Sequence, residues 1–62
     1  MAWFIVDVYS DAKMQYRVAA ETIEADASDT ALLRVAEEYP QAAAFRCLEV
    51  REEIAQRLRR NQ

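Results

Sequence analysis

Apolar and polar positions follow a strand-like pattern in the first third of the chain. The run Trp3 to Tyr9 is rich in β-branched and aromatic residues and predicts a β-strand. A polar break follows from Ser10 to Lys13, where Ser and Asp side chains bond readily to local backbone. Because the chain contains no Gly, tight two-residue turns are disfavoured and we expect a hairpin loop of about four or five residues. Alternation then predicts a second strand over Met14 to Ile23.

Helical spacing replaces alternation in the middle of the chain. Ser28 is the predicted N-cap, with Asp26 as the alternative, and Asp29 places a favourable negative charge in the first turn. Pro40 ends this helix because the residue before a proline is biased away from helical geometry. The apolar stripe of the predicted helix consists of Leu32, Val35, Ala36 and Tyr39.

The last part of the chain predicts one more strand and one more helix. Ala44 to Val50 alternates in polarity, which is typical of a strand. Arg51 to Arg60 favours a helix with Ile54, Ala55 and Leu58 on one stripe. The order β-β-α-β-α allows the third strand to return beside the first. We therefore predict a single α+β domain over residues 1–62, with a three-stranded antiparallel sheet in the order second, first, third strand and both helices packed on the sheet.

The first strand carries apolar side chains on both faces. Phe4, Val6 and Val8 alternate with a second set that contains Trp3, Ile5 and Tyr9. One helix covers one face of a small sheet, so the second set needs another cover. The interpretations left open are a core under the C-terminal helix, a second copy of the chain, or a partner protein.

Asp7 is a charge on the predicted central strand, and an unpaired buried carboxylate would be costly. We expect it to lie at an edge or to pair with Arg17 or Arg46; the alternative is that it anchors a basic group of a partner. The candidate protein-interaction residues are Trp3, Ile5, Asp7, Tyr9 and Arg46.

Composition argues against catalysis. The chain has no His, no Gly and one Cys, which removes the commonest general base, the commonest metal ligand and glycine-rich phosphate loops. Cys47 is expected to be a buried structural thiol. The neighbouring acids Glu37 and Glu38 point apart on a helix. We expect no enzymatic activity, no small-molecule substrate, no cofactor and no metal site.

Charge is uneven along the chain. The net charge is −3, with four basic and nine acidic residues in 1–50, hence −5 there, and four basic and two acidic residues in 51–62, hence +2. An acidic body disfavours nucleic-acid binding. Arg57, Arg59 and Arg60 are the alternative nucleic-acid contacts, although basic residues also suit the end of a helix. The N-terminal apolar run lacks a basic segment and is broken by Asp7, so we expect a cytoplasmic protein without a membrane span.

The pattern of four segments resembles a known group of small proteins. The segments are Trp3 to Tyr9, Tyr16 to Val18, Ala25 to Ser28 and Ala43 to Val50. Together they resemble small phage- or prophage-encoded ββαβ proteins, some of which are anti-CRISPR proteins, although the C-terminal helix departs from the simplest members. This resemblance implies a non-enzymatic inhibitor that binds a host complex.

Three functional hypotheses follow. The favoured one is a protein-binding module, of the phage-inhibitor type, that occludes a surface of a host complex. The second is a homodimeric structural or regulatory subunit. The third is nucleic-acid binding through the Arg-rich C-terminal helix.

Overall fold

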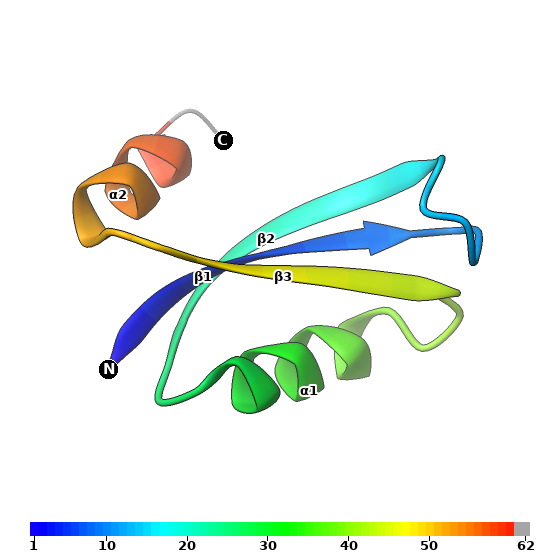
Figure 1. The fold of residues 1–62 in the computed structure, drawn as a ribbon, viewed down its shortest axis with the longest axis horizontal. Helices are drawn as coiled ribbons and strands as arrows, with labels where there is room; N and C mark the ends of the chain where they lie inside the picture. The colour runs from blue at the N-terminus through cyan, green and yellow to red at the C-terminus, as the bar shows by residue number, and fades with distance from the viewer. Residues whose placement is uncertain (61–62) are drawn as a thin grey trace.

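The computed structural model describes residues 1–60 as a three-stranded sheet with two helices (Figure 1). The strands lie in the order β2-β1-β3, as the sequence predicted. The elements, in chain order, are β1 (Ala2–Tyr9), β2 (Arg17–Ala25), α1 (Ser28–Glu38), β3 (Ala44–Val50) and α2 (Glu52–Arg60).

The central strand is β1, and both of its neighbours run antiparallel to it. Ile5 shows the register, since it lies opposite Thr22 of β2 and Leu48 of β3. The most apolar strand thus takes the position where both edges are paired, which is where β-branched side chains gain most from neighbours. The predicted bounds of β3 are confirmed, and β1 begins one residue earlier than predicted.

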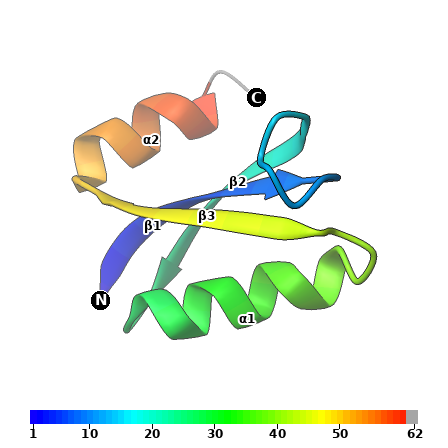
Figure 2. The ribbon, with the colours of Figure 1, turned by 45° about the vertical axis from the view of Figure 1, so that its right-hand side comes forward.

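The main core lies between the sheet and α1. Figure 2 shows α1 running along one face of the sheet, below all three strands in that view. Each fully buried Val or Phe in such a layer contributes about 1.5–3 kcal/mol. The buried side chains of this core are Phe4, Val6, Val8, Ala25, Ala31 and Val35.

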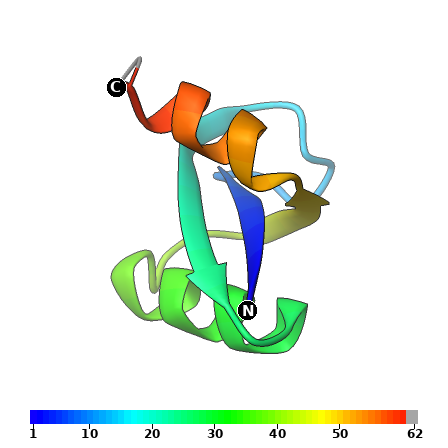
Figure 3. The same ribbon diagram turned by 90° about the vertical axis from the view of Figure 1, so that its left-hand side faces the viewer.

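The second helix lies on the other face and covers only one end of it. Figure 3 shows three layers, with α2 above the sheet and α1 below it. Contacts join α2 to β1 and β2 near the start of β1. Ala55 is fully buried there, and the Arg59 guanidinium lies 5.3 Å from the centre of the Trp3 ring. The main contacts of α2 are with β1 and β2, and Leu48 of β3 stays 55% exposed on this face.

The hairpin between β1 and β2 differs from the prediction. The loop spans residues 10–16, so it is longer than expected, and β2 begins at Arg17 rather than Met14 and continues to Ala25. The cause is Asp11, whose carboxylate accepts the backbone N–H groups of Gln15 and Tyr16 at 2.9–3.1 Å. Met14 completes the loop with a positive φ of 59°, since no Gly is present to take that conformation.

The start of α1 is a second correction. Ser28 was predicted as the N-cap, but Ala27 holds that position with extended backbone angles, and no side chain caps the helix. Ala27 still accepts the first helical bond, from the N–H of Ala31 at 3.2 Å. The helix ends at Glu38, as Pro40 predicted. The second helix begins at Glu52, one residue later than predicted.

Candidate interaction site

The five predicted interaction residues lie on the sheet face that carries α2. Odd-numbered residues of β1 point to this face, and Arg46 joins them because it lies opposite Asp7 in the β1–β3 register. The structure divides them by exposure. Trp3, Ile5 and Asp7 are partly buried, Arg46 is exposed, and Tyr9 is 8% exposed. Tyr9 is therefore a packed side chain, with little surface to offer a partner.

Trp3 packs beneath the C-terminal helix. The Arg59 guanidinium above its ring forms a cation–π contact, worth about 0.5–1 kcal/mol at a partly exposed site. Together with buried Ala55 this contact fixes α2 on the start of β1. The interpretation of Trp3 as core under the C-terminal helix therefore describes the start of β1.

Asp7 pairs across the sheet with Arg17. The Asp7 Oδ1 and Arg17 Nη1 atoms are 3.5 Å apart, and the Asp7 side chain is 19% exposed. This confirms one of the two predicted partners. Arg46 forms no ion pair with the described residues 1–60, so its guanidinium remains available beside Asp7.

Leu48 was not among the predicted site residues, yet it is 55% exposed on the same face. It lies opposite Ile5 and follows Arg46 on the same side of β3. The alternation of polarity along residues 44–50 predicts that Leu48 and Arg46 share one face of the strand. Only the position of α2 in the structure shows that nothing in the described chain covers Leu48. We call Ile5, Asp7, Arg46 and Leu48 the open surface.

The predicted nucleic-acid residues lie in the last turn of α2. Arg57, Arg59 and Arg60 place positive charge where the helix dipole is negative. Arg59 contacts the Trp3 ring, and all three arginines are exposed to solvent. The helix dipole and the Trp3 contact thus explain why basic residues occur in this turn, without a role in binding nucleic acid.

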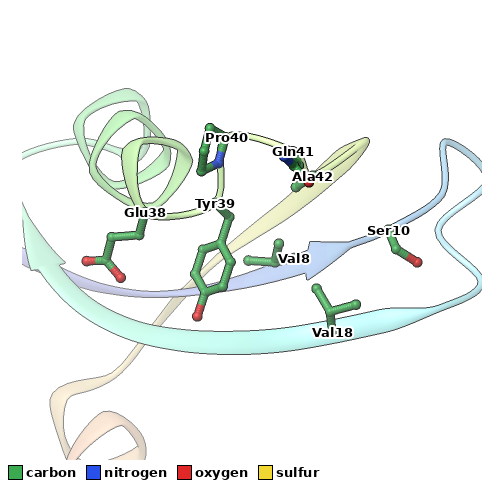
Figure 4. A pocket seen from close by; sticks show the side chains of 8 residues that line it. All are labelled: Val8, Ser10, Val18, Glu38, Tyr39, Pro40, Gln41 and Ala42. Carbon is green, nitrogen blue, oxygen red and sulfur yellow. The ribbon is translucent and has the colours of Figure 1, made fainter.

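A groove of about 430 Å³ lies on the opposite face, at the end of α1. Figure 4 shows the Tyr39 ring between the end of the helix and the two strands, with Val8 and Val18 beside it. The Tyr39 hydroxyl donates a hydrogen bond to Glu21 Oε2 at 3.0 Å. The residues that line the groove are Val8, Ser10, Val18, Glu38, Tyr39, Pro40, Gln41 and Ala42.

A smaller hollow of about 270 Å³ lies at the start of β1. Its lining includes Met1 and Trp3 together with three carboxylates, those of Glu24, Glu49 and Glu52. Within residues 1–60, no group of three or more Cys, Asp or Glu side chains is placed to hold a metal ion.

Two titratable groups on the α1 side are shifted away from ionisation. Cys47 was expected to be buried, and it is half-buried against the core, where desolvation raises the pKa of its thiol. The bond to the Glu21 carboxylate raises the pKa of the Tyr39 hydroxyl, because ionised Tyr39 would lose that donor and face a like charge. Both groups are suited to packing and hydrogen bonding rather than to nucleophilic attack.

The chain matches no protein-family model, no curated protein and no solved structure. In the described part of the chain, both helices are too short or too polar to cross a bilayer.

Proposed function

We propose that the chain is a non-enzymatic protein-binding module and that its contact surface is the open surface. The observation that carries this proposal is Leu48, a large apolar side chain 55% exposed on a sheet face that α2 leaves uncovered. Single exposed apolar residues are common on soluble proteins. Leu48 differs because it lies opposite partly buried Ile5 and beside exposed Arg46, so apolar area adjoins a free cation on one rigid strand pair.

The chemistry of the open surface indicates what the partner presents. Apolar side chains of the partner would cover Leu48 and Ile5, and a carboxylate would pair with the Arg46 guanidinium. Arginine is enriched at protein interfaces because its planar guanidinium binds carboxylates in a bidentate way and stacks on apolar surface. The rigid sheet holds these groups in place before binding, which lowers the entropy cost of association.

The resemblance to small phage-encoded ββαβ proteins suggests how such a module would act on its partner. A domain of this size that occupies a surface on a host complex inhibits it by excluding the natural ligand. Such inhibition needs contact area and charge, and no reactive side chain. On this proposal, the chain acts as an antagonist by occlusion.

The test compares two exposed leucines in a capture experiment. Leu48→Gln removes the apolar contact of the open surface, while Leu33→Gln makes the same change on α1, where Leu33 is 67% exposed. Each tagged protein is incubated with nuclease-treated bacterial lysate and the bound proteins are identified by mass spectrometry. We expect one stoichiometric partner that the Leu33 variant retains and the Leu48 variant loses. Arg46→Glu is expected to lose the same partner by charge reversal.

Three results would overturn this function. Equal retention by both leucine variants would mean that the partner binds elsewhere. Loss of every bound protein on nuclease treatment would favour the Arg-rich helix and a nucleic acid. Recovery of the chain alone, with a sedimentation mass of two copies that Leu48→Gln reduces to one, would identify a homodimer instead.

A further inference from the structure

The groove at the end of α1 combines an apolar wall with uncompensated negative charge. Val8, Val18, Tyr39 and Pro40 supply the wall, and Val18 is 59% exposed although it belongs to a strand. Figure 4 shows these side chains around one space beside the Tyr39 ring. A volume of about 430 Å³ is within the range of sites that accept a side chain or small ligand.

The negative charge comes from the helix as well as from carboxylates. The last turn of α1 contains no basic residue, so no cation on the helix itself balances the negative end of its dipole. Glu38 lines the groove at that end, and the Glu21 carboxylate of β2 accepts a hydrogen bond from the Tyr39 hydroxyl at 3.0 Å. A carboxylate at a helix C-terminus, here that of Glu38, is unfavourable for the isolated chain and favourable for a bound cation.

We infer that this groove binds a lysine or arginine side chain presented by a partner protein. The alkyl stem of such a side chain buries readily on apolar surface while its charged head stays at the polar rim. Figure 4 shows the Tyr39 ring between Val18 and the Glu38 carboxylate, so the stem would lie on Val18 and cross the Tyr39 ring, and the head would reach Glu38. A purely apolar ligand would leave the charge unmatched, and a small inorganic cation would leave the wall uncovered.

The groove is separate from the open surface, because α1 and α2 lie on opposite faces of the sheet (Figure 3). The two sites also differ in the group they bind, because the groove suits a cation, whereas the open surface carries Arg46 and suits a carboxylate. A result that contradicts binding at one of these sites therefore leaves the proposal for the other site standing.

The test uses a short capped alanine peptide with one central lysine, and a matched peptide with norleucine at that position. Each is titrated into the ¹⁵N-labelled protein to millimolar concentration, and amide shifts are followed by NMR. We expect saturable shifts at Val18, Tyr39 and Ala42 with the lysine peptide, weakened by added salt. Glu38→Gln should weaken binding by about threefold, as expected for loss of one solvent-exposed charge pair.

Glu37→Gln is the matched control, because it removes the same charge from the same exposed turn without touching the groove. Both variants relieve negative charge at the helix end and are expected to fold. Val18→Ser keeps every charge and should weaken the lysine peptide by removing the wall. Equal binding of the norleucine peptide, equal effects of the two glutamine variants, shifts centred on Met1 and Glu49, or no shift at all would each overturn the inference.

Discussion

Val6 offers the sharpest test of the packing that positions both surfaces. It is fully buried on the central strand and faces α1. Val6→Ala removes two methyl groups, which costs about 1.6 kcal/mol at about 0.8 kcal/mol for each buried carbon. A residual cavity adds to this, so the expected loss is about 2–3 kcal/mol. A domain of 62 residues has a total stability of only about 3–9 kcal/mol.

Urea denaturation measures this loss directly. Trp3 is the only tryptophan, so its fluorescence follows the sheet and α2, while far-ultraviolet circular dichroism follows the helices. The unfolding midpoint should fall with an unchanged m-value, which shows that the same surface is exposed on unfolding. Leu33→Ala, at a site 67% exposed, should change stability by less than about 0.5 kcal/mol.

Comparable losses in the two variants would refute the assignment of Val6 to the core. So would a loss in Val6→Ala that appears only in the m-value, because that would indicate a change in the denatured state. If the expected difference is found, the layer between β1 and α1 is the main source of stability. Tyr39 and the groove then depend on it for their position.

Two further predictions concern α2 and the hairpin. Ala55→Asp should release α2 from the sheet and shift Trp3 fluorescence to longer wavelength, because Ala55 is fully buried. The control is Gln56→Asp, which adds the same charge on the exposed side of α2 and should leave the spectrum unchanged. The backbone N–H of Tyr16, and then that of Gln15, lowers the pKa of Asp11 below its ordinary value of 3.8. The ionised Asp11 carboxylate therefore stabilises the folded state above the ordinary pKa, and this stabilisation is lost as the pH falls through the lowered pKa. The difference in melting temperature between wild type and Asp11→Ala should shrink in acid. A difference that persists at the lowest pH would contradict the second prediction.

Much of the fold could be predicted because local patterns and global packing agree. Alternation along β3 gave its bounds, and Pro40 gave the end of α1. The strand order followed from connectivity, since the helix between β2 and β3 returns the chain to the free edge of β1. For β3 and the end of α1 the determining residues are near in sequence, whereas the strand order follows from the crossover connection.

The predicted starts of β2 and α1 were wrong because single-residue propensity does not determine which backbone groups a side chain binds or which of two neighbouring residues takes a position. Asp11 bonds to backbone groups four and five residues later, which extends the loop and delays β2. Ser28 has the right chemistry for an N-cap but is already helical, because the chain enters α1 through extended Ala27. Propensity ranks residues for a position; it does not choose between neighbouring positions.

The candidate site was predictable in part for the same reason. Side-chain parity placed Trp3, Ile5 and Tyr9 on one face of β1, and the register adds Arg46 to that face because it lies opposite Asp7. Parity gives the face of a side chain and not what covers it, so burial of Tyr9 and exposure of Leu48 required the structure.

The length of α2 and its position over β1 and β2 together leave part of one face open. With nine residues, α2 is about 13.5 Å long, whereas β1 with eight residues extends about 27 Å. A helix of that length cannot cover both ends of the strand, and the Trp3–Arg59 contact holds it at the first end. Leu48 lies on β3, to the side of the β1–β2 surface that α2 contacts, and gains burial only when another polypeptide contacts it. Exposed Arg46 beside it makes a partner with a carboxylate the favourable one, while the acidic end of α1 on the other face excludes that same carboxylate.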